Sequence, residues 1–335
     1  MHDSIKSWML NASSLAFRAA ALVNVRPFAK AFLRHTFLFN EPKSRSIDRL
    51  RRELEFMRRS HTPVNLPEFV SSFCAGDILD GALVFTTDDV HLDVYEVHQE
   101  FLDFGVPLAM YIPIGWISSS DTSEAGALVE AVTLIEWYEG EEVVVNFGSR
   151  HSLHLSSERK ALNIDYILSG REALAEQLDD LCSVIAALPG SHRQRHKQRS
   201  TCSWAELHEL ASSGVYIGSH SISHVPLAKA STQRRQFEIC ESKRILELKF
   251  GSCTTFAYPF GTRGTYDTNT DAELSDAGYS VAFLTHSDVI CSDSPALRLP
   301  RISLPDAPLA LEEFKARVSG AGILPQRFKS ALGGR

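Results

Sequence analysis

Residues 81–112 alternate between apolar runs and a helical pattern in an order that only a small group of folds accommodates. Residues 81–87 indicate a buried strand, and residues 94–104 have helical character that stops at a glycine. A second apolar run covers residues 106–112 and is followed by a proline. A strand, a helix and another strand in this order are typical of a parallel α/β sheet or barrel.

The second half of the chain continues this alternation. Ser203 and Glu206 form a capping-box pattern at the start of a predicted helix, and Thr270 and Glu273 repeat that pattern. The remaining predicted elements are a short strand at 215–218, a long helix at about 232–250, a strand at 254–258 and a strand at 279–284. The candidate site residues described below follow strand ends, where parallel α/β barrels place their chemistry.

The composition limits the class of protein. A chain of 335 residues with 44% hydrophobic residues can bury a large core, which suits one large α/β domain with an extension. A net charge of −7 argues against a general nucleic-acid binder, because such a protein needs a basic surface. The six cysteines include no CxxC pair, so we expect reduced thiols and a cytoplasmic protein.

The amino-terminal segment Ser13–Val25 is apolar but short, and Arg18 and Asn24 interrupt it. It has no clear charged start or cleavage site, which favours an amphipathic helix. A targeting segment or a peripheral contact with a membrane surface is the alternative. No run approaches the roughly 20 apolar residues that span a bilayer, so no transmembrane segment is expected.

Two short patterns carry candidate chemistry. His220 and His224 are four residues apart, and on a helical turn they would share one face and offer two imidazoles to one ion. A carboxylate from another segment, such as Asp88 or Asp89, would complete the three protein ligands of a catalytic zinc. Taken singly, the histidines could be surface residues and the aspartates a turn or a helix cap.

Taken together, three segments resemble the successive motifs of the polysaccharide deacetylases that share the NodB homology domain. They are Thr-Thr-Asp-Asp-Val at 86–90, Gly-Ser-His-Ser-Ile-Ser-His at 218–224 and Phe-Ala-Tyr-Pro-Phe-Gly at 256–261. The resemblance covers roughly residues 45–304. It implies a distorted parallel (β/α) barrel that carries a divalent metal, usually zinc, and hydrolyses an N-acetyl group from an amino sugar.

The resemblance also implies roles for individual residues. Asp89, His220 and His224 match the metal ligands, and Asp88 matches the catalytic base. Tyr258 is the candidate whose backbone N–H stabilises the oxyanion, because its loop follows a predicted strand. The substrate-binding candidates are Tyr258, Pro259, Phe260, Gly261 and Arg301.

The chain departs from the family pattern in three places. Thr87 and Val90 stand where the family usually has phenylalanine and glycine, and a β-branched residue does not readily take a positive φ, so we expect a different loop here. The arginine-rich third motif is absent, which leaves Arg301 as a candidate to orient the base. His286 matches the motif of the general acid loosely and is either that acid or a loop histidine.

The leading hypothesis is a metal-dependent N-deacetylase of an N-acetylhexosamine polysaccharide, oligosaccharide or glycan precursor, such as a chitooligosaccharide. One alternative is a related hydrolase of another amide, such as a cyclic ureide or imide. The other is a catalytically impaired glycan-binding homologue. Trp116, Trp137 and Tyr138 are candidates for stacking on a sugar, with core packing as the alternative.

The predicted organisation has three parts. They are a partly helical extension at 1–44, the barrel domain at 45–310 and a C-terminal helix and tail at 311–335. A variable insertion interrupts the barrel at about 116–200, with an amphipathic helix at 171–188 and an exposed basic loop at 191–199.

Overall fold

The structure is a computed structural model that describes residues 28–38, 41–117, 124–136, 138–156, 158–170, 174, 177–188 and 201–320. The expected helix at 13–25, the basic loop at 191–199, Trp137 and the tail beyond residue 320 lie outside the described residues. Among the residues described, every helix is too short or too polar to cross a bilayer. The six cysteines are free thiols.

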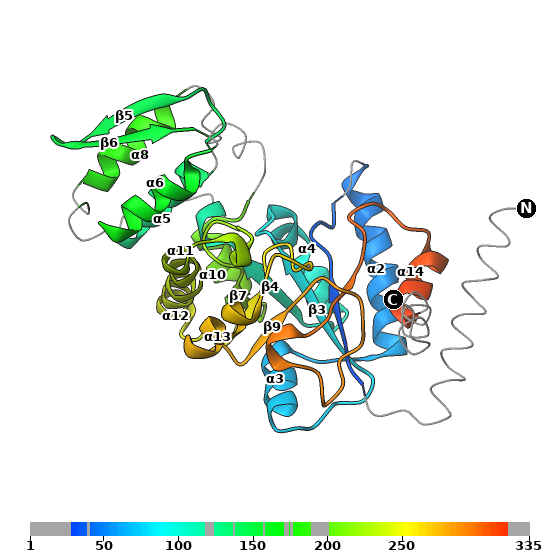
Figure 1. Cartoon of the computed structure of the whole chain (residues 1–335). Coiled ribbons are helices and arrows are strands. Elements are labelled where there is room, and N and C mark those ends of the chain that lie inside the picture. The colour runs from blue at the N-terminus through cyan, green and yellow to red at the C-terminus, as the bar shows by residue number, and fades with distance from the viewer. Residues whose placement is uncertain are drawn as a thin grey trace, which may run out of the picture.

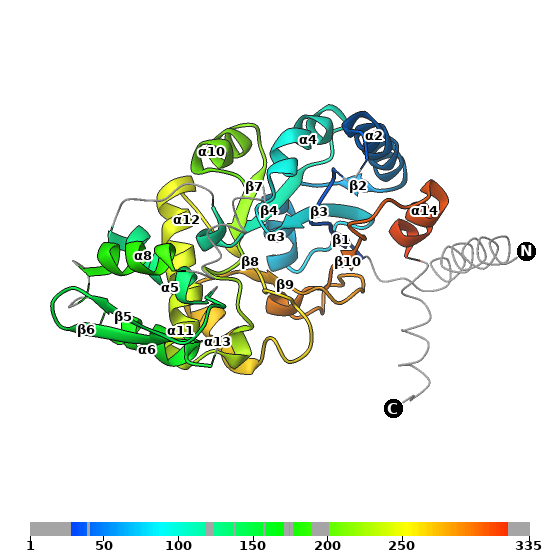
Figure 2. The same ribbon diagram turned by 90° about the horizontal axis from the view of Figure 1, so that it is seen from above.

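A parallel sheet curled into a barrel forms the centre of the molecule, with helices around it (Figures 1 and 2). The strands lie in the order β10-β1-β3-β4-β7-β8-β9, and each pairing along this path is parallel. Their bounds are β1 Lys30–Leu33, β3 Ala82–Asp88, β4 Leu108–Ile112, β7 Tyr216–Ser219, β8 Thr255–Ala257, β9 Val281–Phe283 and β10 Ile302–Ser303. The short strand β2 (Thr62–Pro63) pairs with β3. The predicted distorted (β/α) barrel is confirmed.

The two ends of the sheet meet through the segment that leads into β10. Phe283 of β9 forms a parallel bridge with Leu299. The N–H of Leu299 donates to the carbonyl of Ala282, and its carbonyl accepts from Leu284, both at 2.8 Å. The N–H of Arg301 donates to the carbonyl of His286 at 3.1 Å, and the chain then pairs with β1. This junction fixes the backbone of Arg301 between β9 and β1.

The helices pack their apolar faces on the outside of the sheet. In α2 (Lys43–Ser60), Leu50, Leu54 and Met57 recur at helical spacing and are buried, as the sequence pattern requires. Helix α14 (Leu311–Ser319) lies beside α2, with the rings of Phe314 and Phe56 6.4 Å apart. The other barrel helices are α3 Leu66–Cys74, α4 Leu92–Asp103, α10 Trp204–Ser212, α11 Thr232–Gln236, α12 Ser242–Phe250 and α13 Thr268–Asp276.

The sheet begins before the expected boundary at residue 45. Strand β1 pairs with β3 on one side and β10 on the other, and all four of its residues are buried. The boundary expected from the sequence is therefore too late. Strand β1 has only four residues, which are too few for a periodic pattern to indicate a strand. Its first residue, Lys30, is buried, although a lysine in the sequence suggests an exposed position.

The insertion forms a lobe of its own beside the barrel, seen at the upper left of Figure 1. It contains α5 (Glu124–Glu136), an antiparallel hairpin of β5 (Val143–Phe147) and β6 (His151–Leu155), α6 (Lys160–Ser169) and α8 (Leu178–Ala187). The hydroxyl of Ser231 donates to Asp165 of α6 at 2.5 Å, which joins the lobe to the start of α11. Helix α8 covers the second half of the helix expected at 171–188.

One of the two predicted capping boxes is displaced. Ser203 caps α10 with Glu206 as predicted. Helix α13, however, begins at Thr268, two residues before Thr270, because Asp267 is its N-cap and accepts from the Thr270 N–H at 2.8 Å. Glu273 instead accepts two hydrogen bonds from Arg235, at 2.6 and 2.7 Å. The box predicted from Thr270 and Glu273 is therefore wrong.

Candidate metal and catalytic site

The two aspartates lie at the carboxyl end of β3, where the chain turns sharply. Asp89 and Val90 both have left-handed backbone conformations, with φ of 73° and 53°. The expectation that Val90 avoids a positive φ is wrong. Its side chain is fully buried and its carbonyl accepts from Cys202 N–H at 2.9 Å, so tertiary contacts offset a conformational cost of about 1–2 kcal/mol.

The two histidines lie in the loop after β7 rather than on a helix. The helical spacing expected for them is therefore wrong, and two left-handed residues, Ser221 (φ 69°) and His224 (φ 56°), bring them together instead. The His220 N–H donates to the carbonyl of Ile112 on the neighbouring strand at 3.1 Å. The two imidazole rings lie 4.8 Å apart, centre to centre.

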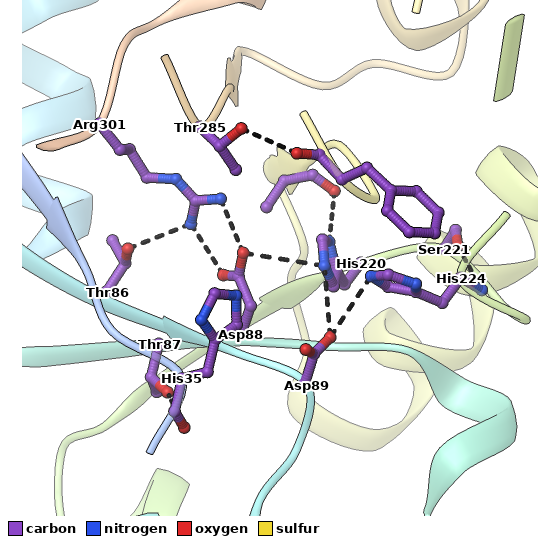
Figure 3. A network of polar contacts seen from close by, with 12 residues as sticks. His35, Thr86, Thr87, Asp88, Asp89, His220, Ser221, His224, Thr285 and Arg301 are labelled. Atoms are coloured by element: carbon purple, nitrogen blue, oxygen red, sulfur yellow. Dashed lines mark hydrogen bonds and ion pairs between the residues drawn. The ribbon is translucent and has the colours of Figure 1, made fainter. Parts of the chain in front are cut away.

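Asp89, His220 and His224 converge at one point (Figure 3). Their ligand atoms all lie within 4.8 Å of one another. Oδ1 of Asp89 is 3.4 Å from Nε2 of His224 and 3.7 Å from Nε2 of His220. This oxygen is buried and accepts no hydrogen bond from any described residue. A buried anionic oxygen facing two imidazole nitrogens fits a divalent metal such as zinc.

The state of His220 suits a metal ligand. Its Nδ1 lies 2.7 Å from the carbonyl of Ala257, which can only accept, so Nδ1 carries the proton and Nε2 presents its lone pair to the cluster. Burial lowers the pKa of His220 to about 4. The imidazole is therefore neutral at physiological pH, as a metal ligand must be.

Asp88 is held by Arg301 in a two-point ion pair (Figure 3). The guanidinium donates to both carboxylate oxygens at 2.7 Å, and it also donates to Thr86 Oγ1 at 3.1 Å and to the carbonyl of Leu284 at 3.0 Å. Burial alone would raise the pKa of Asp88, but the positive charge of Arg301 and its hydrogen bonds to the carboxylate lower it to about 2. These bonds orient the carboxylate of Asp88. Arg301 is fully buried and therefore cannot contact a substrate, so the expectation that it binds substrate is wrong.

The loop after β8 has two buried residues, Tyr258 and Pro259, and two residues at the site, Phe260 and Gly261. The N–H of Tyr258 donates to the carbonyl of Phe283 at 3.0 Å, so it is occupied within the sheet and not directed at an oxyanion. The hydroxyl of Tyr258 donates to Asp271 at 2.7 Å, away from the metal cluster, and its ring is buried. Neither role expected of Tyr258 agrees with this arrangement. Pro259 is buried as well.

Phe260 and Gly261 are the members of that loop at the site. The Phe260 ring lies 4.7 Å from the His224 ring and is 49% exposed, which leaves an apolar face open beside the cluster. Gly261 has φ of 57°, and a Cβ there would lie 2.7 Å from the backbone nitrogen of Thr285. Trp116 contacts His224 from the end of β4, at 4.9 Å between rings.

Of the other aromatic candidates, Tyr138 is buried in the insertion and donates to the carbonyl of Glu141 at 2.8 Å, so it packs in the core. His286 is exposed on the loop after β9. Within the described part of the chain, no contact joins its side chain to Asp88, Asp89 or the metal-site histidines. The structure does not bring His286 into the site.

His35 is the site residue that the sequence analysis missed. It follows β1, and Figure 3 shows its ring beside Asp88. Its Nδ1 is 3.2 Å from Asp306 Oδ2, and its backbone N–H donates to Asp306 Oδ1 at 3.0 Å. Burial lowers the pKa of His35, but the bond to Asp306 and the charges of Asp88 and Asp89 outweigh burial and raise it to about 8. If β1 had been recognised as a strand, His35 would have been a candidate, because it follows a strand end as Asp89 does.

The chain resembles known proteins in part of its sequence and in its fold. The family model for polysaccharide deacetylase matches residues 183–282, which include both histidines and the loop after β8 but not the aspartates. A Bacillus subtilis protein, YxkH, named for polysaccharide deacetylation, is 29% identical over 98 residues, which span 29% of this chain and 34% of that protein. The match thus covers about a third of the length of that relative.

Two solved structures share the fold. IcaB from Ammonifex degensii aligns with a TM-score of 0.55 at 15% identity and covers 88% of this chain and 97% of that one. The Streptococcus pyogenes deacetylase PplD, solved in complex with acetate, aligns with a TM-score of 0.53 at 12% identity and covers 84% and 94% of the two chains. At these identities the likeness supports the barrel fold and not a particular substrate.

Proposed function

We propose that this chain, which resembles the polysaccharide deacetylases in part of its sequence and in its fold, is a metal-dependent hydrolase of N-acetyl groups on an N-acetylhexosamine glycan or glycan precursor. The observation that carries the proposal is the convergence of Asp89, His220 and His224 beside the Asp88–Arg301 pair. One carboxylate and two neutral imidazoles are a donor set of catalytic zinc. A divalent ion held there would polarise the acetamide carbonyl and lower the pKa of a bound water.

Asp88 is the proposed general base. With a pKa of about 2 it is ionised at neutral pH, and Arg301 fixes both of its oxygens. Its Oδ2 lies 3.7 Å from Nε2 of His220, on the side of the metal ligands. A carboxylate of such low pKa is a weak base, so it can take a proton only from a water whose own pKa is lowered.

His35 is the proposed general acid. Loss of acetate leaves an amine that must be protonated, and a histidine with a pKa of about 8 carries a proton at neutral pH. Its side chain is one-third exposed, at 33%, which suits a group that meets a substrate at the mouth of the site. The bond to Asp306 fixes its ring orientation. The exposed face of Phe260 would support the sugar beside His224.

The test is acetate release by zinc-loaded protein from a panel of N-acetylated oligosaccharides that includes chitooligosaccharides. Asp88→Asn preserves the shape of the side chain and removes the base, so kcat should fall about 10²- to 10⁴-fold. Zinc binding should persist, because Asp88 is not among the three converging ligands. Failure of the wild-type protein to release acetate from any substrate, or an Asp88→Asn variant as active as wild type, would contradict the proposal.

A further inference from the structure

The loop that carries both metal-site histidines is held by a carboxylate outside the site. Glu238 is fully buried, and its Oε2 accepts from the backbone N–H groups of Ile222 and Ser223, both at 2.9 Å. Its Oε1 accepts from the hydroxyl of Ser223. Three hydrogen-bond donors from the segment between His220 and His224 therefore bind the carboxylate of Glu238.

This loop needs an external anchor because of its backbone conformation. Ser221 and His224 are left-handed although neither is a glycine, at a cost of about 1–2 kcal/mol each. Such conformations persist where surrounding contacts fix them. The carbonyl of Ile222 accepts from Gly115 N–H at 2.8 Å, while Glu238 holds the N–H side of the same residue. The peptide groups between the two ligands are thus bound from both sides.

Glu238 lies in a local irregularity of its helix. The segment Phe237–Glu241 between α11 and α12 is a π-helical turn. A π turn accommodates an extra residue and so changes the direction in which neighbouring side chains point. Here it occurs at the residue whose carboxylate reaches the metal-site loop. The irregularity and the contact to the loop coincide at Glu238.

The same network reaches the insertion lobe. Arg234, one turn before Glu238, is buried and donates to the Ser223 hydroxyl at 3.1 Å. Its guanidinium also pairs with Glu136 of α5 at 2.9 Å. The last turn of α5 is therefore joined to the metal-site loop through a single arginine.

We propose that Glu238 is a positioning residue for the metal site, and that Arg234 and Glu136 extend its network to the insertion. The proposal rests on the metal site of the proposed function. Glu238 fixes the peptide groups between His220 and His224, and so it fixes the separation of the two imidazoles. Loss of a partner that orients metal ligands typically weakens metal binding about 10- to 100-fold.

The test measures zinc affinity, by competition with a chelator, together with the visible absorption of the cobalt-substituted protein. Glu238→Gln keeps the size of the side chain but replaces one acceptor oxygen with an amino group. We expect zinc affinity to fall about tenfold or more, with a changed cobalt spectrum. Glu241→Gln is the matched control, because Glu241 lies in the same π turn and pairs with Arg244 rather than the loop. It should bind zinc as wild type does.

Ser223→Ala provides a second arm if Glu238→Gln does not fold. It removes the hydroxyl that bonds to both Glu238 and Arg234 and leaves the two backbone bonds to Glu238, so it should weaken zinc binding as Glu238→Gln does, but by less. Folded variants that match Glu241→Gln in affinity and spectrum would overturn the inference. A wild-type protein that binds no metal would overturn the proposed function, and the inference with it.

Discussion

Val90 has a backbone φ of 53°, although its branched Cβ disfavours this region. Within helices and strands, glycine in place of alanine lowers the stability of the folded protein by about 0.5–1 kcal/mol. In the left-handed region the order reverses, because the Cβ of alanine clashes with the backbone and glycine has no Cβ. We therefore predict that Val90→Gly is more stable than Val90→Ala, by about 1 kcal/mol. Urea unfolding of the two variants measures this difference. Both should be less stable than wild type, because the valine side chain is buried. A more stable alanine variant would contradict the assigned backbone.

The protonation of His35 should appear in the pH dependence of the rate. Its pKa is raised to about 8, so the proton-donating form is complete below that pH and is lost as the pH rises through it. We predict that kcat falls on the alkaline side, and that Asp306→Asn moves this fall to lower pH, because it removes the carboxylate that supports the charged imidazole.

His286→Gln is the control for this measurement, since the exposed side chain of His286 makes no described contact with the site. It should leave the rate and the alkaline limb unchanged, whereas His35→Gln should lower kcat about 10²-fold or more. The reverse result, with His286 essential and His35 dispensable, would restore the assignment expected from the sequence.

Individual residues differ in how far the sequence could place them. The roles of Asp88, Asp89, His220 and His224 came from motif order, and the structure brings these four side chains together. The backbone N–H of Tyr258 could not be assessed in that way. Whether a strand-end amide is already bound depends on its register with the neighbouring strand, which sequence does not reveal.

At the scale of elements, the loop after β8 carries a glycine that is restricted in two ways. Gly261 combines a positive φ of 57° with a backbone atom 2.7 Å from where a Cβ would stand. Gly261→Ala must displace the neighbouring Thr285 backbone or the loop itself. We therefore predict that stability falls by more than the roughly 1 kcal/mol that a positive φ costs alanine. We also predict a lower kcat, because Phe260 shifts with the loop.

Gly264 is the matched control for that substitution. It lies in the same loop with φ of 88°, and a Cβ there meets nothing within 4 Å. Gly264→Ala should cost only the conformational term of about 1 kcal/mol and keep normal activity. Thermal unfolding and acetate release separate the two variants. Equal effects at both glycines would show that close packing at Gly261 does not matter.

The elements that the sequence placed correctly have long periodic patterns. The helix predicted at 232–250 is an example, because α11, the π-helical turn and α12 follow one another there without a break. The elements that it misplaced are short or depend on distant contacts. Strand β1 has four residues, and the loop of His220 and His224 owes its shape to Gly115 and Glu238 rather than to its own spacing. Tertiary contacts of this kind are not local properties of the sequence.

At the scale of the whole molecule, the barrel was predictable because the strand ends that carry the chemistry recur in a fixed order along the chain. The insertion at about 116–200 and one of its helices were predicted as well, but its hairpin and its other helices were not, because they form no recognisable sequence motif. Its connection to the site through Glu136 and Arg234 emerges only when the lobe and barrel are seen together.

The proposed function requires one metal ion per chain that acts in deacetylation. Its most direct test is a titration of metal-free protein with zinc, in which acetate release from an N-acetylated oligosaccharide is followed at each addition. We predict that release is absent without metal, rises in proportion to added zinc and reaches its full rate at about one ion per chain, as expected for three converging ligands. Full activity in the metal-free protein, or no activity at any zinc concentration, would contradict metal-dependent deacetylation by this protein.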